Sequence, residues 1–369
     1  MSNLVRLLGL NLENFRNLKT ANLSFSGDRI FFIGPNGQGK TNLLEAIGLS
    51  SNLRSFRKSG MDGLVRENAE RSQLFFRFCE DDGEEHEVLL SFRSKAEKVL
   101  QVDGEKIKRF GDYLGKFPAV TLSSRDFRLI REGPSDRRKW LDLLLSSSSR
   151  QYFENLQTFH RALRGRNALL KKGSGESELL AFEHILSEAT VPLQAARKNS
   201  IPMLADSLEK HYSFLCGGTE KASLRYHPDW PEMTSEEILD RLAEDRERDR
   251  IMGMTRRGPH RDDFVFLLED RDARNYSSEG QQRGLVLAIR LAEYFYLKDS
   301  LRRIPLLLAD DVLGELDQER KANFRKLLPP QAQVFATGTE FPSKDEVDMW
   351  ETFRVSDGTF TKVEGTRNG

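Results

Sequence analysis

The chain has 369 residues and carries 57 basic (Lys+Arg) and 57 acidic (Asp+Glu) side chains, so its formal net charge is zero. A neutral chain gives no global argument for a polyanionic partner, so a nucleic-acid surface would have to be a local patch. The two cysteines, Cys79 and Cys216, argue against a disulfide framework and a structural zinc site. No apolar run approaches membrane-spanning length and no secretion signal is recognisable, so we expect a cytoplasmic protein without membrane contact.

The first third of the chain is rich in short apolar segments that predict strands. These strand predictions cover residues 4–10, 18–25, 29–33, 72–78, 87–92, 98–102 and 118–122. One helix is predicted among them, over residues 41–50, directly after a glycine-rich segment. An asparagine-flanked turn at residues 14–17 carries Arg16.

From residue 133 the pattern becomes mainly helical. Apolar residues at spacings of three and four predict two long antiparallel helices, over 150–172 and 177–211, joined by a Gly/Ser turn. Further elements are predicted at 222–226, 235–248, 264–268, 284–300, 304–311 and 333–336. The alternation of strands and helices at both ends predicts an α/β fold whose core comprises residues 1–132 and 252–369. Residues 133–251 would form an inserted, mainly helical lobe.

Residues 34–41 match the pattern G-x-x-x-x-G-K-[ST] in full. Glycines let such a loop curl so that backbone N–H groups point at phosphate oxygens, and the following helix adds its positive end. Lysine supplies a cation for the β- and γ-phosphates, and threonine offers a hydroxyl to Mg²⁺. The predicted ATP-binding residues are Gly34, Pro35, Asn36, Gly37, Gln38, Gly39, Lys40 and Thr41.

Two adjacent carboxylates follow a short apolar run at residues 306–309. A buried strand that ends in acids can deliver them to a phosphate site. Asp310 would then hold Mg²⁺, and Asp311 would orient or deprotonate the attacking water. Taken alone, the same pattern also fits a strand that runs into an acidic surface turn.

Residues 278–281, Ser-Glu-Gly-Gln, stand before a long predicted helix. They resemble the signature sequence of ATP-binding-cassette (ABC) ATPases, in which Ser278, Gly280 and Gln281 would contact the γ-phosphate held by a second subunit. The alternative interpretation is an ordinary N-capped helix start. Residues 314–317 resemble the D-loop that crosses the dimer interface in such ATPases.

Taken together, these motifs resemble those of the bacterial RecF family, recombination mediators related to the heads of SMC and Rad50 proteins. The resemblance extends over essentially the whole chain. Its motifs are NFRN (14–17), residues 34–41, GPSDRR (133–138), GPHRDD (258–263), SEGQQR (278–283), ADDVLGELD (309–317) and TGT (337–339). The phosphate loop is shared by many ATPases, whereas its combination with GPHRDD and SEGQQR is more specific.

The resemblance implies an ABC-type ATPase core and a DNA-repair protein that binds ATP and Mg²⁺. Such a protein would bind DNA (single-stranded, duplex or a junction), form a homodimer on ATP, and hydrolyse ATP slowly as a switch. It would help to load recombinase at gaps together with RecR- and RecO-type mediators. Carried over by position, Arg16 joins the nucleotide-binding residues, Asp310 is a metal ligand, and Asp311 and Lys40 act in catalysis.

Three departures from the general ABC pattern stand out. Asp311 occupies a position where transporter ATPases usually have glutamate, and its shorter side chain predicts slow turnover. The usual switch histidine after strand 333–336 is absent, and Thr337 or Thr339 stands there instead. For the Q-loop glutamine, Asp126 is only a weak candidate, and His260 has no assigned step.

The nearest alternative is the head of an SMC- or Rad50-like DNA-tethering ATPase. Those proteins need long heptad arrays between the phosphate loop and the signature, and only two moderate helices are predicted here. DNA contact is the least specific prediction, because exposed basic groups are often only solvated faces. The candidate groups are Arg54, Arg57 and Lys58; Arg137, Arg138 and Lys139; and Arg161, Arg164 and Arg166 with Lys171 and Lys172.

Overall fold

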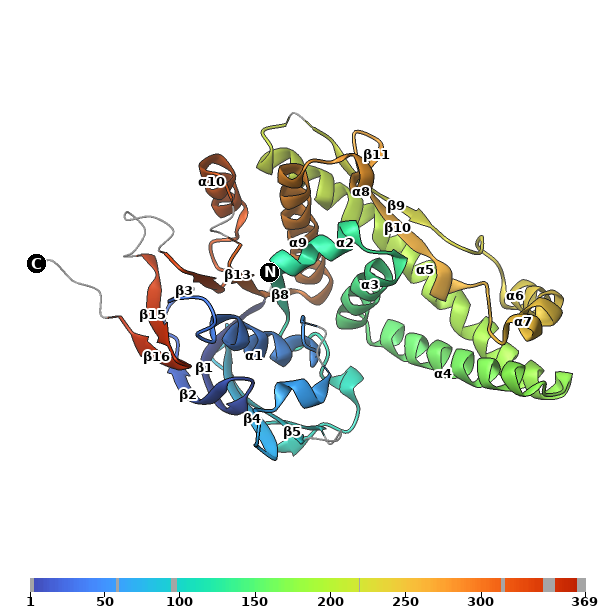
Figure 1. The fold of residues 1–369 in the computed structure, drawn as a ribbon, viewed down its shortest axis with the longest axis horizontal. Coiled ribbons are helices and arrows are strands. Elements are labelled where there is room, and N and C mark those ends of the chain that lie inside the picture. Colours follow the sequence, from blue (N-terminus) through green and yellow to red (C-terminus); the bar gives the residue numbers. More distant parts are fainter. Residues whose placement is uncertain are drawn as a thin grey trace, which may run out of the picture. The chain divides into compact units, whose positions relative to one another are not determined.

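The computed structural model describes residues 3–57, 60–93, 98–218, 220–312, 316–340 and 349–363 (Figure 1). The chain divides into two compact units. The first comprises Met1–Asp126, Phe214–Cys216 and Ile289–Gly369, and the second comprises Phe127–Ser213 and Gly217–Ala288. None of the helices within these described ranges is long and apolar enough to cross a membrane.

The first unit contains two sheets built from both ends of the chain. Its strands are β1 (Asn3–Phe15), β2 (Leu18–Ser24), β3 (Arg29–Ile33), β4 (Arg71–Glu80), β5 (Glu85–Arg93), β6 (Lys98–Val102), β7 (Glu105–Lys106), β8 (Ala119–Ser123), β12 (Arg303–Ile304), β13 (Leu306–Asp310), β14 (Val334–Gly338), β15 (Glu351–Ser356) and β16 (Thr359–Lys362). Its helices are α1 (Lys40–Asn52), α10 (Gln318–Leu327) and the second half of α9 (Glu279–Leu301), with short 3-10 turns at Met61–Leu64, Phe110–Asp112 and Ser124–Phe127.

The sheet that positions the site has the order β16-β15-β3-β14-β13-β8 within the described part of the chain. Its five strands from β15 to β8 are parallel, and β16 is an antiparallel edge. The other sheet has the order β12-β1-β4-β5-β6-β7, with β2 also paired to β1. Apolar side chains of α1 and of both sheets share one buried core, which fixes the start of α1 against the ends of the parallel strands.

The second unit is mainly helical. Its helices are α2 (Arg128–Arg131), α3 (Pro134–Ser148), α4 (Arg150–Lys172), α5 (Glu176–Leu215, up to residue 213), α6 (Ser235–Glu244), α7 (Arg246–Met252), α8 (Ala273–Tyr276) and the start of α9, with a 3-10 turn at Pro259–Arg261. Figure 1 shows α4 alongside α5. The two helices approach so closely that a Cβ on Gly165 would lie 2.3 Å from the Phe182 ring. A small sheet in the described residues has the order β11 (Arg271–Asp272), β10 (Asp263–Leu268), β9 (Ala222–His227).

The structure confirms the α/β core assembled from both ends of the chain and the long helix at 150–172. Some elements differ from expectation. Helix α9 begins at Glu279 rather than at residue 284, because Ser278 caps it. The predicted helix 235–248 is two helices that meet at Asp245.

The boundaries of the units also differ from those expected at 132/133 and 251/252, since the contacts place them at 126/127 and 288/289. The physical reason is the antiparallel pairing of β10 with β9, which joins residues 263–268 to the helical unit. Residues 258–263 and 278–281 therefore belong to that unit.

Candidate nucleotide-binding site

The loop of residues 34–41 connects the parallel strand β3 to helix α1, in the middle of the parallel sheet. Gly37 and Gly39 have φ values of 81° and 109°, which side-chain-bearing residues rarely adopt. A Cβ on Gly39 would also lie 2.7 Å from Cδ2 of Leu18. The glycine spacing of the motif is therefore required by the path of the loop.

The loop is anchored from two sides while its tip remains exposed. The backbone N–H groups of Asp357 and Gly358 donate to the side-chain and main-chain oxygens of Gln38, over 2.6 and 3.1 Å. Asn17 Nδ2 approaches the Gly37 carbonyl at 3.5 Å. Pro35, Asn36 and Gly37 are exposed. The β15–β16 turn thus holds the loop in place through hydrogen bonds to Gln38.

The ammonium group of Lys40 lies inside the curl of the loop. Its Nζ donates to the carbonyl oxygens of Gly34 and Pro35, over 2.5 and 2.8 Å. Burial lowers the pKa of Lys40, and the charges of Asp311 and Asp310 oppose that shift. Helix α1 starts at Lys40 without a side-chain cap, so its first N–H groups point at the space within the loop. A polyphosphate would be met there by both the cation and the helix end.

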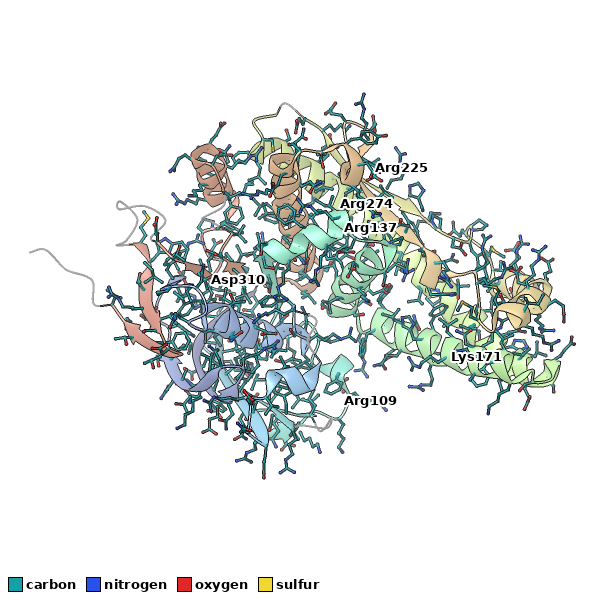
Figure 2. The ribbon with its side chains drawn as sticks, in the orientation of Figure 1. Arg109, Arg137, Lys171, Arg225, Arg274 and Asp310 are labelled. Carbon is teal, nitrogen blue, oxygen red and sulfur yellow. The ribbon has the colours of Figure 1, made fainter. Side chains whose placement is uncertain are left out.

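Thr41 and Asp310 meet where α1 starts and β13 ends, as expected from the sequence. The Thr41 hydroxyl donates to Asp310 Oδ1 over 2.8 Å, and the Thr337 hydroxyl donates to the same oxygen over 3.2 Å. Burial raises the pKa of Asp310, whereas the hydrogen bonds from Thr41 and Thr337 lower it. Figure 2 labels Asp310 beside the end of β13. A hydroxyl next to a carboxylate is an oxygen donor set that fits Mg²⁺.

Asp311 lies just beyond β13 with an exposed side chain and a φ of 58°. Its backbone N–H donates to the Thr337 hydroxyl over 2.9 Å. The left-handed conformation turns the chain sharply between two consecutive acids, so Asp310 is half-buried in the site while Asp311 is exposed. An exposed carboxylate at this point can reach a water molecule beside a bound phosphate.

Arg16 pairs with an acid of α1. Its guanidinium donates twice to the Glu45 carboxylate, over 2.9 and 2.6 Å, and Glu45 is fully buried. Ser55 also donates to Glu45, and Arg57 lies 3.7 Å from it. Glu45 was not among the residues predicted from the sequence. Its signal was present, because Glu45 is the only charged residue between Lys40 and Arg54 in an otherwise apolar and small-residue helix.

In the second unit, Ser278 and Gln281 form a reciprocal cap at the start of α9. Gln281 N–H donates to Ser278 Oγ over 3.3 Å, and Ser278 N–H donates to Gln281 Oε1 over 2.7 Å. The Gln281 amide also donates to Glu220, which accepts a hydrogen bond from Tyr212. Ser278 is exposed and Gly280 lies beside it in the first turn. The local geometry is that of an N-cap, and it leaves the Ser278 side chain exposed.

Several weaker predictions have definite places in the structure. Asp126 accepts from the Ser123 backbone and forms an ion pair with Arg290 over 2.6 Å, so its carboxylate is already engaged. His260 bonds to the Thr255 carbonyl over 3.0 Å in the helical unit. The D-loop prediction at 314–317 lies partly outside the described residues, which resume at Leu316.

The structure reduces the set of basic side chains that could meet DNA. Arg166 is fully buried and Arg137 is 7% exposed, paired through two hydrogen bonds with Asp263. Arg138 donates to a backbone carbonyl, and Lys58 lies outside the described residues. Helix α4 keeps an exposed basic series that includes Lys171 (Figure 2). Its members are Arg161, Arg164, Lys171 and Lys172.

Comparison with known proteins gives the same family at the level of sequence and structure. Residues 6–352 match the RecF/RecN/SMC N-terminal domain family. The DNA replication and repair protein RecF of Leptospira interrogans is 36% identical over 335 residues, which cover 90% of this chain and 91% of that protein.

Solved structures extend the match to the fold. The structure of the recombination mediator protein RecF with ATP, in the RecFOR pathway, matches with a TM-score of 0.89 and 35% identity over 98% of both chains. The Smc head domain from Pyrococcus furiosus matches with a TM-score of 0.56 at 16% identity, over 97% of this chain and 96% of that chain, and shows the ABC-type ATPase fold alone. The chain therefore belongs to the RecF family within the RecF/RecN/SMC N-terminal domain group.

Proposed function

We propose that the chain is an ATP-dependent DNA-binding protein of recombinational DNA repair and replication restart. ATP held by residues 34–41 of one copy would be covered by Ser278, Gly280 and Gln281 of a second copy, so that ATP binding drives head-to-tail dimerisation on DNA. Slow hydrolysis would separate the copies. The dimer would help to load recombinase at gaps with RecR- and RecO-type mediators in the cytoplasm.

The main support for this proposal is the position of three side chains of the phosphate site. Lys40, Thr41 and Asp310 converge at the ends of parallel strands in a chain that aligns over 98% of its length with an ATP-bound recombination mediator. The loop amides and Lys40 would bind the β- and γ-phosphates, and Thr41 and Asp310 would hold Mg²⁺. Bound Mg²⁺ would supply positive charge against the triphosphate oxygens. Asp311 would orient the attacking water and accept its proton.

The role of ATP in this proposal is that of a switch. Asp311 carries one methylene fewer than the glutamate usual in transporter ATPases, which would hold a water less closely and slow turnover. Nucleotide would then act mainly to hold the dimer together, with hydrolysis as a release step. DNA binding measured with ATP and with a non-hydrolysable analogue separates this switch from a motor, because a switch binds DNA equally well with both.

The alternative function, an SMC- or Rad50-like tethering ATPase, has less support. Helices α4 and α5 have 23 and 40 residues, and α5 contains Pro192 and Pro202, so neither continues into a long coiled coil within the described chain. The Smc head resembles this chain in fold only.

Sedimentation velocity with ATP, ADP and no nucleotide, each with and without a gapped duplex, tests the proposal. We expect a dimer with ATP and a monomer with ADP, with the gapped duplex sedimenting with the dimer. A monomer at saturating ATP and DNA would refute the dimer mechanism.

The Ser278→Arg variant tests the contribution of the second copy. It should bind ATP as a monomer but fail to dimerise, because the arginine would fill the space of the phosphate contact. Ser177→Arg is the matched control, an exposed serine in the first turn of α5. Light scattering with and without ATP gives the result, and normal dimerisation of Ser278→Arg would contradict the trans contact.

A further inference from the structure

Thr337 lies at the carboxyl end of β14 and is 1% exposed. The parallel register pairs Ala309 of β13 with Ala336 of β14, so the next residues, Asp310 and Thr337, face each other where the strands end. The Thr337 hydroxyl uses both of its functions there. It donates to Asp310 Oδ1 over 3.2 Å and accepts from the Asp311 N–H over 2.9 Å.

Asp310 and Asp311 are held in place by different hydrogen bonds. The Asp310 carboxylate is held by Thr41 from α1 and by Thr337 from β14, both on the same oxygen. The Asp311 backbone adopts a φ of 58°, in the left-handed region that costs free energy for most residues with a side chain. A hydrogen bond to its N–H offsets part of that cost and fixes the turn. The hydroxyl that receives this bond belongs to Thr337.

We infer that Thr337 is a positioning residue of the hydrolytic site, whose hydroxyl locks the metal-binding carboxylate of Asp310 and the turn of Asp311 into one geometry. The inference rests on the proposed function, since it assigns a role within the same site. Thr337 touches neither the phosphate loop nor a water in this role. It acts through the two acids, as outer hydrogen-bonding partners do around metal ligands, where their loss typically costs 10- to 100-fold in activity or metal affinity.

The hydroxyl can be separated from the bulk of the side chain. Thr337→Val keeps the shape and removes both hydrogen bonds, whereas Thr337→Ser keeps the hydroxyl and removes a methyl group. Thr352→Val is the matched control, because Thr352 of β15 is also buried in this sheet and its hydroxyl donates to the Trp350 carbonyl over 3.3 Å. Both valine variants keep the volume of the side chain, but only Thr337→Val uncouples the acids.

Two measurements test the inference on the full-length protein. The first is steady-state ATP hydrolysis with kcat and KM separated. The second is the Mg²⁺ concentration that gives half of the thermal stabilisation by a non-hydrolysable ATP analogue. For Thr337→Val we expect kcat to fall by about tenfold or more with KM within about twofold, and the Mg²⁺ midpoint to rise by about tenfold. Thr337→Ser and Thr352→Val should stay within about twofold of the unmodified chain.

A folded Thr337→Val variant with unchanged kcat and unchanged Mg²⁺ midpoint would overturn the inference, as would a Thr337→Ser variant that is equally impaired. If Thr337→Val does not fold, Thr337→Ala also removes the hydroxyl and gives the same comparison. Absence of hydrolysis or ATP binding in the unmodified chain would count against the proposed function instead. Where only hydrolysis is absent, the Mg²⁺ midpoint alone decides on Thr337.

Discussion

The phosphate-loop region of the first unit and the region around Asp262 in the second unit both contain linked polar side chains, but they are enclosed differently. Asp262 is fully buried and accepts from Arg197, from Tyr226 and from the Asp229 backbone, over 2.6 to 2.9 Å. Around the phosphate loop, Lys40 bonds to backbone carbonyls of a loop with an exposed tip. The hydrogen bonds around Asp262 are sealed from solvent, whereas those of Lys40 can be exchanged for hydrogen bonds to a ligand.

The enclosure of Asp262 indicates that the GPHRDD motif at residues 258–263 has a structural role. Arg197 of α5 reaches Asp262 and the Pro259 carbonyl, and also pairs with Asp142 of α3. Arg137 of α3 pairs with Asp263. The motif thereby ties the long helices of its unit to the β9–β10 sheet. A sequence motif that accompanies a nucleotide site is in this case part of the scaffold.

The largest effect is expected for Arg197→Met, which breaks the sealed network. The change leaves the buried carboxylate of Asp262 without its cation, and removing one partner of a buried ion pair costs about 3–5 kcal/mol. The second unit should unfold at much lower denaturant concentration. Tryptophan fluorescence can follow it, because Trp140 and Trp230 belong to this unit.

The neighbouring lysine provides the control for this variant. Lys198 pairs with Glu232 on the surface, with side chains 60% and 71% exposed, and such pairs contribute little. Lys198→Met should therefore leave the unfolding midpoint nearly unchanged. Equal effects of the two variants would mean that the network does not support the fold as described.

In the phosphate-loop region, Asp311→Asn should separate ATP binding from ATP hydrolysis. The amide keeps the size of the side chain but cannot accept the proton of the attacking water, so turnover should fall by about 100-fold. ATP binding and the dimer should persist. Asp299→Asn, an exposed acid near the end of α9, is the control. Undiminished turnover of Asp311→Asn in a single-turnover assay would refute the catalytic role of Asp311.

Lys40→Ala should weaken ATP binding by roughly tenfold or more, since charge-assisted hydrogen bonds contribute about 1.5–3 kcal/mol. ATP-dependent dimerisation should be lost at moderate nucleotide concentrations. Stability should change little, because in the folded chain the ammonium donates to the carbonyls of Gly34 and Pro35, in a loop with an exposed tip. Equilibrium binding of a fluorescent ATP analogue measures the effect, with the exposed Lys106→Ala as control. Normal affinity would contradict the phosphate-loop assignment.

The sequence predicted the elements of the site because each has a local signal. The glycine spacing of residues 34–41, the apolar run before Asp310 and the periodicity of α4 all depend on neighbours in the chain. The structure then shows Thr41 and Asp310 in contact, although 269 positions separate them.

Long-range contacts without a local signal were not predictable. Gln38 is held by the turn at 357–358, and Arg16 by Glu45, through pairings that no spacing rule describes. The division into units at 288/289 has the same cause, because the β9–β10 pairing joins residues 263–268 to the helical unit. Arg137 and Arg166 were predicted to belong to a basic surface, but both are buried. The sequence alone does not distinguish an exposed arginine from one that is buried and paired with an acid.

The smallest effect concerns the pH dependence of the helical unit, through His260. Burial lowers the pKa of His260 to about 4, with the Thr255 hydrogen bond opposing the shift. Because the unfolded chain binds a proton near pH 6.5 and the folded chain near pH 4, protonation favours unfolding as the pH falls through this window. Between pH 7 and pH 5 this one group should lower the free energy of unfolding by about 2 kcal/mol.

His260→Gln isolates that contribution, because glutamine can donate to the Thr255 carbonyl but does not titrate. The variant should lose about 2 kcal/mol less than the unmodified chain between pH 7 and pH 5, measured by urea unfolding at each pH. The same pH dependence of unfolding is compared with that of His211→Gln, since burial also lowers the pKa of His211. Nucleotide binding by the two variants should follow that of the unmodified chain at pH 7, because both histidines belong to the helical unit and not to the phosphate-loop unit. A His260→Gln variant that folds normally and keeps the full pH dependence would show that the pKa of His260 in the folded chain is close to its value in the unfolded chain, and hence that burial does not lower it.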